Sequence, residues 1–304
     1  MKKYSKKISL GLLSFILLSG VGYLSFQHLN KKELPVPEIK SEPAPGLSYF
    51  LSDLEKEIDG TYQTKLTKGE VENLYNGITM VDVPHAFVES FPEGINPDVT
   101  EDQTLFIKIM TAHLLRTNEK IVRERKVVFE LINKIQAQKE LSESEKKVFA
   151  FLTKKYDVEH LHTDISKVLE LVNRVDIIPV SMGVAQAIWV TNWGTKMQKS
   201  PFLEYAWKDE EHYEPIEFDK ISQATDSFAL QLNTRSQLIH FRMMRQSSRV
   251  FIYSRTYGFY LLPELVNYLP TIPSYTTQLR LVYSLGYIQD LDNACFKDAC
   301  YLTK

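Results

Sequence analysis

The dominant pattern in the chain is an apolar residue every three or four positions, the spacing that places side chains on one face of an α-helix. The longest such stripe begins at Leu105 and ends at Ile135. Thr100 precedes it and is followed three positions later by Gln103, which predicts a capping box with Thr100 as the cap. We therefore expect one long amphipathic helix here, or two that are nearly collinear.

Shorter stretches with the same spacing come later in the chain. Ser142 and Glu145 form a second capping-box pattern ahead of the apolar positions Val148, Phe149 and Leu152, which predicts a helix start at this point. A short helix is also expected around Tyr49–Glu57. Further helices are predicted over Ile165–Val172, Ser181–Trp189, Phe218–Arg245 and Leu261–Leu285. The pattern as a whole indicates a mainly α protein.

A different pattern stands at the N-terminus, where the residues from Ile8 to Phe26 carry no charge. As a helix rising about 1.5 Å per residue, this run spans roughly 28 Å, close to the hydrocarbon thickness of a bilayer. More basic residues precede the run than follow it, which favours an N-terminus on the cytoplasmic side. We predict an uncleaved signal-anchor helix at residues 8–26 after a cytoplasmic tail at 1–7. A cleaved signal peptide is the alternative, and it places the rest of the chain in the same compartment.

The next segment, 27–46, has four prolines among polar residues. Spaced prolines of this kind predict an extended, semi-rigid tether that holds the following domain clear of the bilayer. Beyond it we expect an N-terminal extension at 47–80 and a helical subdomain at 81–175. The localisation predicted from these features is the bacterial inner membrane, crossed once, with the bulk of the chain in the periplasm.

Composition narrows the possible chemistry. The formal net charge is -2 and only 12 of 304 residues are glycine, so neither a nucleic-acid partner nor a glycine-rich phosphate loop is expected. His160 and His162 lack the spacing and the companion glutamate of a helical zinc site, and we expect no metal and no cofactor. Cys295 and Cys300 can form a disulfide in an oxidising compartment or stay two thiols.

Several short motifs occur in a suggestive order. They are Val83–Phe87, Leu105–Ile107, Leu114–Glu119, Ile178–Ser181, Ala185–Ala187, Trp193–Thr195, Leu232–Thr234, Phe241–Arg242 with Arg245, and the tyrosines Tyr268 and Tyr275. Together they resemble the Bax-type glucosaminidase-domain proteins of bacteria, relatives of the glucosaminidase domain of the flagellar muramidase. The resemblance covers about Val81 to Phe296. It implies a lysozyme-like glucosaminidase fold, with the glucosaminidase-like domain at 176–304.

The chain departs from that family where the chemistry should be. The family's central motif reads approximately Ala-Gln-Ala-x-x-Glu-Ser-Gly-Trp-Gly-Thr, and its glutamate is the general acid that protonates the glycosidic oxygen. Val190 occupies that position here, followed by Thr191 and Asn192. Valine has no proton to give, and general acid catalysis contributes about 10²–10⁴-fold to the rate. The resemblance therefore implies a scaffold without its catalytic acid.

The resemblance also implies a substrate groove. The positions it carries over are Gln186, Asn192, Trp193, Thr195, Phe202, Trp207, Tyr268 and Tyr275. Aromatic side chains suit the apolar faces of sugar rings, although each is as often plain core. We expect a catalytically inactive, membrane-anchored periplasmic protein that binds peptidoglycan glycan strands or an envelope protein.

Two alternatives stay open. One is an active peptidoglycan β-N-acetylglucosaminidase in which Glu204 has taken over as the acid; the run Asp209–Glu211 is a weaker candidate because charge runs are usually solvated loops. The other is a structural or assembly protein of the cell envelope whose groove is closed. An open cleft lined by Trp193 and Tyr268 would favour glycan binding, and a cleft filled by the side chain of Trp189 or Val190 would favour a scaffold. A buried Glu204 that points into the cleft would favour the enzyme.

Overall fold

The computed structural model describes residues 51–79, 81–207, 213–251, 257–269, 272 and 274–297, with only the backbone of 205–207, 213 and 249–251. The segment Ser48–Lys304 forms one compact unit. The predicted anchor at 8–26 and tether at 27–46 lie outside the described residues. Within the described part of the chain, no helix combines the length and the apolar character of a membrane span.

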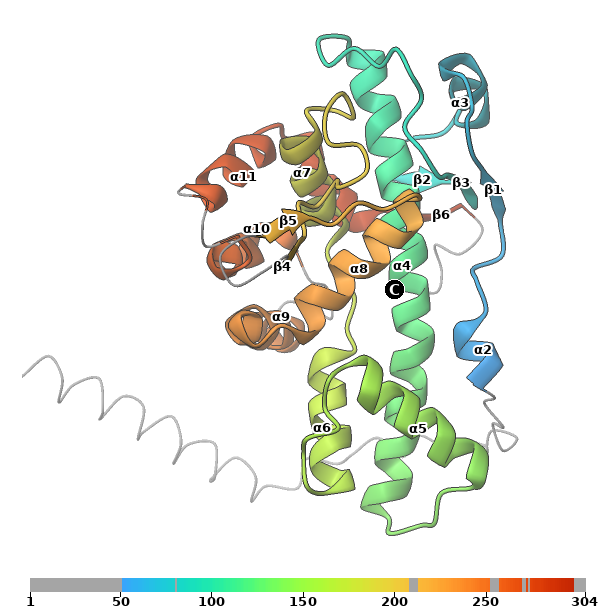
Figure 1. Ribbon diagram of the computed structural model, residues 1–304, viewed down its shortest axis with the longest axis vertical. Helices are drawn as coiled ribbons and strands as arrows, with labels where there is room; N and C mark the ends of the chain where they lie inside the picture. The colour runs from blue at the N-terminus through green and yellow to red at the C-terminus, as the bar shows by residue number, and fades with distance from the viewer. Residues whose placement is uncertain are drawn as a thin grey trace, which may run out of the picture. The chain divides into compact units, whose positions relative to one another are not determined.

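The described part is mainly helical, as predicted (Figure 1). The α-helices are α2 Leu51–Glu55, α3 Lys68–Leu74, α4 Thr100–Gln136, α5 Glu143–Lys155, α6 Asp164–Arg174, α7 Val180–Thr191, α8 Ile221–Thr234, α9 Ile239–Phe251, α10 Gly258–Leu261, α11 Tyr275–Tyr283 and α12 Tyr287–Asp290. The 3-10 helices are η1 Ser236–Leu238, η2 Leu262–Asn267 and η3 Leu291–Asn293.

Strands are short and come in pairs. Strand β1 (Thr61–Gln63) pairs in parallel with β3 (Ala86–Val88), and β2 (Asp82–Val83) pairs in parallel with β6 (Cys295–Phe296). Strands β4 (Tyr205–Trp207) and β5 (Tyr213–Pro215) are antiparallel. The β2–β6 pair joins the early part of the domain to its last described residues.

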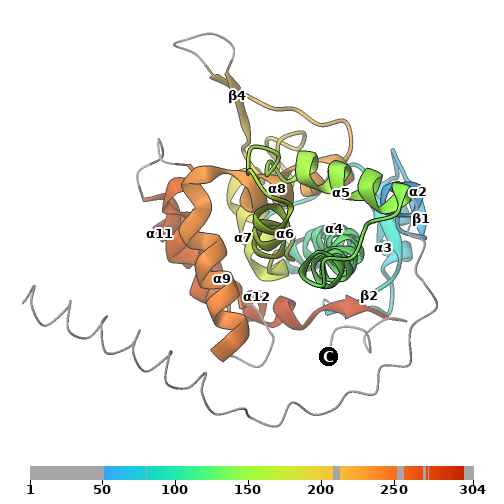
Figure 2. The same ribbon diagram turned by 90° about the horizontal axis from the view of Figure 1, so that it is seen from below.

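Helix α4 is the axis on which the domain is built. Its 37 residues are one continuous helix, which settles the choice left by the apolar stripe. Helices α5, α6, α7 and α8 all pack on it, and Figure 2, which looks almost along α4, shows them gathered around it. Residues before and after position 175 therefore contribute to one shared hydrophobic core.

The predicted start of α4 is wrong in one respect. Val99, not Thr100, is the N-cap, and no side chain caps the helix. The Gln103 side chain donates to the Pro97 carbonyl (2.7 Å), and Asp102 accepts from the Asn96 amide (2.7 Å). These bonds fold the preceding segment onto the first turn, and Thr100 lies inside the helix, one residue past the cap position.

The Ser142–Glu145 capping box is confirmed, with the Ser142 amide donating to Glu145 at 2.9 Å. Two predicted helices are instead divided. The expected helix at Phe218–Arg245 breaks at Arg235, which adopts an extended conformation between α8 and η1. The expected helix at Leu261–Leu285 becomes η2 and α11, because Pro263 starts η2 and the prolines at positions 270 and 273 disfavour a continuous helix before α11.

Candidate functional site

Four predicted groove residues do meet, but in the core. The Gln186 side chain, on α7, donates to the Phe202 carbonyl (3.1 Å) and accepts from the Tyr275 hydroxyl (2.6 Å). The Tyr268 hydroxyl donates to the same Phe202 carbonyl (3.3 Å). All four side chains are buried. The resemblance thus identified residues that lie together, while their burial gives them a packing role in this structure.

Aromatic packing reinforces this cluster. The rings of Phe202 and Phe228 are stacked with centroids 4.2 Å apart, and Tyr268 meets Phe228 edge-on at 5.6 Å. Burial raises the pKa of both Tyr268 and Tyr275 well above the usual value. Their hydroxyls therefore stay protonated and act as donors, which fastens the Phe202 segment to α7, η2 and α11.

The turn after α7 places the Trp193-Gly194-Thr195 motif. Asn192 ends α7 in the left-handed region, and Gly194 has φ +82°. A Cβ on Gly194 would lie 3.2 Å from Phe106 and 3.3 Å from Phe91, so the turn passes close against aromatic rings. Trp193 is buried edge-on against Phe106, with ring centroids 5.9 Å apart.

Only part of the predicted groove reaches solvent. Asn192 and Thr195 are exposed and bonded to each other through the Asn192 amide and the Thr195 hydroxyl at 3.2 Å. Val190 is 9% exposed. The side chain of Trp207 and the residues 209–211 lie outside the described part, as does Cys300. The disulfide between Cys295 and Cys300 consequently stays a prediction.

Of the predicted site residues, Glu204 has the environment best suited to acid–base chemistry. It is 1% exposed. Its Oε2 accepts from the Ser227 hydroxyl (2.6 Å) and from the Gln231 amide, both on α8, while its Oε1 has no hydrogen-bond partner. Burial raises the pKa of Glu204 to about 7, against the lowering effects of the Ser227 bond and the Arg235 charge. A carboxyl group that is half protonated near neutral pH has the property that a general acid requires.

Sequence reasoning missed a second buried acid, Asp292. Its side chain accepts from the Ser181 amide (3.0 Å), the Ser181 hydroxyl (2.7 Å) and the Gly258 amide (2.7 Å). Burial raises its pKa to about 6. The Ser181 hydroxyl also meets the Tyr283 hydroxyl at 2.7 Å. Ser181 stands in the Ile178–Ser181 motif, so the motif was the available signal, but nothing in the sequence paired it with a residue 111 positions away.

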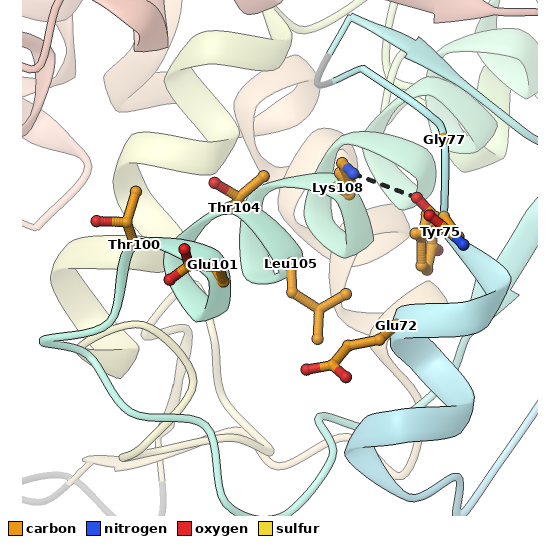
Figure 3. Close-up of a pocket in the computed structure, with 9 residues that line it drawn as sticks. Glu72, Tyr75, Gly77, Thr100, Glu101, Thr104, Leu105 and Lys108 are labelled. Carbon is orange, nitrogen blue, oxygen red and sulfur yellow. Dashed lines mark hydrogen bonds between the residues drawn. The ribbon is translucent and has the colours of Figure 1, made fainter.

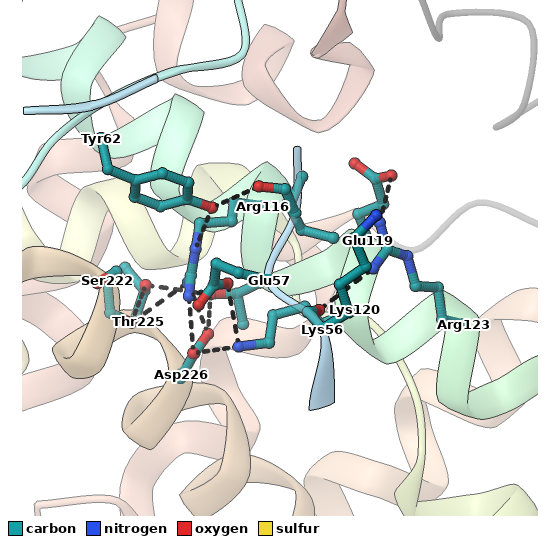
Figure 4. A network of polar contacts seen from close by, with 12 residues as sticks. Lys56, Glu57, Tyr62, Arg116, Glu119, Lys120, Arg123, Ser222, Thr225 and Asp226 are labelled. Atoms are coloured by element: carbon teal, nitrogen blue, oxygen red, sulfur yellow. Dashed lines mark hydrogen bonds and ion pairs between the residues drawn. The ribbon is translucent and has the colours of Figure 1, made fainter. Parts of the chain in front are cut away.

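A polar network joins the segment after α2 to helices α4 and α8 (Figure 4). Arg116 is buried and pairs with Glu57 (2.5 Å) and with Asp226 (3.0 Å); Lys120 contacts the same two carboxylates at 3.3 and 3.0 Å. Burial alone would raise the pKa of Asp226, but the charges of Arg116 and Lys120 lower it below the usual value. Two cations face two carboxylates, so this cluster is balanced and holds elements together.

A surface pocket lies between the end of α3 and the start of α4 (Figure 3), with a volume of about 310 Å³. Leu105 forms part of its wall, and Glu72, Glu101 and Thr104 also line it. The Lys108 ammonium donates to the Tyr75 carbonyl (3.2 Å), and burial lowers the pKa of Lys108. None of the predicted groove residues lies here.

The described part of the chain contains no group of three or more histidine, cysteine, aspartate or glutamate side chains placed to hold a metal ion. Glu204 and Asp292 are two buried carboxyl groups with raised pKa values, which suits them to acid–base chemistry. Comparison with known proteins adds no further assignment: no protein-family model, no curated protein and no solved structure matches this chain.

Proposed function

We propose that this chain is a membrane-anchored periplasmic protein of the bacterial cell envelope with a lysozyme-like, glucosaminidase-like domain that binds and does not cleave. The observation that carries the proposal is Val190 at the position of the family's acid. An apolar side chain that is 9% exposed can neither protonate a leaving group nor position water. Burial of Trp193, Phe202, Tyr268 and Tyr275 leaves none of these four rings exposed to stack on a sugar, which favours an envelope-protein partner or an assembly role.

Peptidoglycan digestion tests the loss of chemistry. A fragment from Ser48 to Lys304 matches the compact unit. It is incubated with purified sacculi, and soluble products are analysed by mass spectrometry beside Val190→Glu and Val190→Gln variants. We expect no glycan release from the native fragment or from Val190→Gln, which matches glutamate in size but lacks the acid. Release by Val190→Glu alone would show that the glycan groove persists; release by the native fragment would refute the proposal.

Binding is measured in the same samples by co-sedimentation with sacculi. Retention of the native fragment on sacculi would support glycan as the ligand. If the fragment stays in the supernatant and Val190→Glu is silent, the assembly role with a protein partner is favoured. Circular dichroism and urea unfolding of each variant separate a lost activity from a lost fold.

A second candidate function rests on Glu204. Its buried carboxyl, with a pKa raised to about 7 and an unpartnered Oε1, suits the relocated acid of an active N-acetylglucosaminidase. The test is Glu204→Gln beside Glu140→Gln, an exposed control. If native protein releases glycan fragments, this candidate requires Glu204→Gln to lower the rate by about 10²-fold or more, with Glu140→Gln unchanged.

The anchor needs its own test because residues 8–26 lie outside the described part. Full-length protein and a version lacking 8–26 are expressed in a bacterial host and fractionated, and membranes are washed with alkaline carbonate. We expect the full-length chain to stay with the inner membrane and to be digested by protease added to the periplasmic side. A full-length chain that is washed off, or that is protected from protease until the cells are lysed, would contradict this placement.

A further inference from the structure

The segment at residues 196–204, which we term the strap, lies against the aromatic cluster described above. Residues 196–199 are exposed and residues 200–204 are buried, so the strap has an outer part in water and an inner part in the core. The inner part contributes the Phe202 ring, which stacks on Phe228, and Phe228 in turn meets Tyr268. Tyr275 continues this row, with its ring centroid 6.1 Å from that of Tyr268. The strap therefore supplies the last ring of a buried aromatic row.

The backbone of the strap is strained. Met197 has φ +41° and Leu203 has φ +55°, both in the left-handed region. Residues with a side chain avoid this region, because their Cβ comes too close to the following carbonyl oxygen. Backbone of this kind persists only where the surrounding contacts hold it in place. The strap consequently depends on its contacts, and its backbone relaxes when they are lost.

Polar contacts hold the inner part of the strap. The Phe202 carbonyl accepts from the Gln186 side chain (3.1 Å) and from the Tyr268 hydroxyl (3.3 Å). The Glu204 carbonyl accepts from the Ile216 amide (2.7 Å). Burial raises the pKa of Tyr268 well above the usual value, so its hydroxyl stays neutral. Within residues 200–204 the single ionisable side chain is that of Glu204, and a pH response of the inner part depends on it.

The Glu204 carboxyl group joins the strap to α8. Its Oε2 accepts from the Ser227 hydroxyl (2.6 Å) and from the Gln231 amide. The Oε1 atoms of Glu204 and Gln231 are both buried without a hydrogen-bond partner among the described residues. An ionised carboxylate needs donors at both oxygens, and a buried charge that lacks them is costly. These surroundings therefore accept neutral Glu204 and disfavour its anion.

The charges near Glu204 do not offset its burial. Arg235, which follows α8, is the cation whose charge favours the ionised form. Beside the strap, Lys199 is exposed and pairs with the exposed Glu217 at 3.7 Å, and Glu214 on β5 is exposed as well. Exposed charges of this kind are screened by water and ions. Burial outweighs them and raises the pKa of Glu204 to about 7.

We propose that the strap is a pH-sensitive cover, which a proton on Glu204 keeps closed and whose opening after loss of that proton uncovers the aromatic row. The proton passes to water, and the carboxylate left behind is hydrated once the strap has opened. The closed form is favoured fully below pH 4.5 and loses this advantage as the pH rises through about 7. Between pH 5 and pH 8 the equilibrium constant for opening should rise about 70-fold.

Hydrogen exchange of the full-length chain, read by mass spectrometry and corrected for the intrinsic rate at each pH, measures the opening. The reporting amides are those of Leu203, bonded to the Ser200 carbonyl (3.0 Å), and of Ile216. Glu204→Gln stays neutral, so we expect these amides to exchange at least about tenfold faster in the native chain than in the variant at pH 8, and within about fivefold at pH 5. Amides of α4 should be equally protected in both.

Oxidative footprinting measures the uncovering of the rings. The Phe202 and Tyr268 side chains should be oxidised at least about fivefold faster in the native chain than in Glu204→Gln at pH 8, and alike at pH 5. The exposed Glu140→Gln variant is the matched control and should behave like the native chain in both experiments. Circular dichroism at pH 5 confirms that each variant is folded before its opening is compared.

A second variant tests the role of the proton by another route. The Ser227 hydrogen bond lowers the pKa of Glu204, so Ser227→Ala should raise it further. Opening in the native chain should level off above about pH 7, and in Ser227→Ala it should continue to increase to a higher pH. A variant that merely loosened the strap would open more at every pH and level off where the native chain does, which would contradict the proposal.

Two other results would overturn it. One is equal exchange of the strap amides in the native chain and Glu204→Gln at pH 8. The other is loss of α4 protection in parallel with the strap, because the whole domain would then be unfolding.

For its role the inference rests on the proposed function, since Phe202, Tyr268 and Tyr275 are the rings that the resemblance assigns to a groove. These experiments use no ligand, so a chain that opens with pH but ignores sacculi would keep this inference alone.

Discussion

The Glu204 carboxyl group is buried, and two side chains on helix α8 donate hydrogen bonds to it in place of water. Ser227 and Gln231 lie one helical turn apart on α8, and both donate to the same Glu204 oxygen. The other oxygen has no partner. Burial disfavours the charged form more strongly than the Ser227 hydrogen bond and the Arg235 charge favour it, which is why the pKa rises to about 7 from the ordinary value of 4.5.

This shift makes stability depend on pH. Between pH 4.5 and about 7 the folded state holds a proton on Glu204 that the unfolded state has released, so the free energy of unfolding falls as the pH rises, by up to about 3 kcal/mol from this group. Glu204→Gln stays neutral and should lose that part of the slope. Urea unfolding at pH 5 and pH 8 measures it.

Asp292 titrates in an overlapping range, but it is present in both the native protein and Glu204→Gln. The difference between their free energies of unfolding at each pH therefore reports on Glu204 alone. The exposed Glu140→Gln variant should keep the native slope. Parallel pH profiles for native and Glu204→Gln would mean that the carboxyl ionises as it does in water.

The same residue shows how far the sequence could lead. Its place relative to the resembling motifs made Glu204 a candidate, but its environment comes from residues 23 and 27 positions later. Gln186 and Tyr275 were both predicted to lie in the groove, and they are hydrogen-bonded to each other. Their burial could not be predicted, because a groove residue and a core residue can carry the same side chain. The pairing of Ser181 with Asp292 had no local signal at all.

On the scale of single elements, helix starts divide into those with and without a side-chain cap. Ser142 accepts from the Glu145 amide and completes a capping box at α5, and Thr67 and Thr163 do the same at α3 and α6. Thr100 caps nothing. Similar polar residues thus stand at four helix starts, but only three of these starts have a side-chain cap. The path of the segment before each helix decides which residue takes the cap position.

Alanine substitutions at two starts should therefore differ. Ser142→Ala removes a cap and should lower the free energy of unfolding by about 1 kcal/mol. Thr100→Ala should change it by less than about 0.5 kcal/mol, since alanine is the better helix former and no cap is lost. Urea unfolding of both variants decides the matter; a larger loss at Thr100 than at Ser142 would contradict the cap assignment.

The ion-pair network that joins the segment after α2 to helices α4 and α8 permits a second comparison. Asp226→Ala leaves the buried Arg116 with Glu57 as its remaining acidic partner and should cost about 3 kcal/mol. Glu57→Ala should cost about 1 kcal/mol or less, because the Glu57 side chain is 48% exposed and its pairing is screened by water. Urea unfolding measures both losses. Equal losses would contradict this ranking and indicate that Glu57 and Asp226 contribute alike to neutralising Arg116.

Helix periodicity predicted the existence of most elements but not all their limits. Arg242 explains one break: its guanidinium donates to the Arg235 carbonyl (2.8 Å) and lies 3.5 Å from the Leu232 carbonyl. It therefore serves the carbonyls that a continuous helix would have used internally. Such competition between a side chain and the helix backbone depends on tertiary structure. The apolar spacing alone could not reveal it, and it therefore predicted helix across the break between α8 and α9.

At the scale of the whole molecule, the domain is closed by contacts between distant parts of the chain. Phe296 stacks on His85 with ring centroids 3.9 Å apart and meets Phe87 edge-on. The Cys295 amide donates to the Val81 carbonyl at 2.9 Å, and the Lys297 amide to the Val83 carbonyl at 3.0 Å. The last strand is thereby held against the segment that leads into α4.

Removing the Phe296 ring should weaken this closure. Phe296→Ala deletes a buried aromatic side chain and should lower the free energy of unfolding by about 3–5 kcal/mol. Leu281→Ala, at a position 61% exposed, serves as the control and should change stability by less than about 0.5 kcal/mol. Urea unfolding compares the two. A Phe296→Ala loss as small as the control's would show that the closure contributes little to global stability.

The contact between the last strand, β6, and the segment before α4 also affects when the domain can finish folding during synthesis. Val81 leaves the ribosome long before Cys295, its partner 214 positions later, has been synthesised. Contacts of such separation form late, because the loop between them must first be ordered. Until Cys295 and Phe296 have been synthesised, the domain lacks the strand that pairs with β2, so the closed fold can form only after nearly all of the described chain has been made.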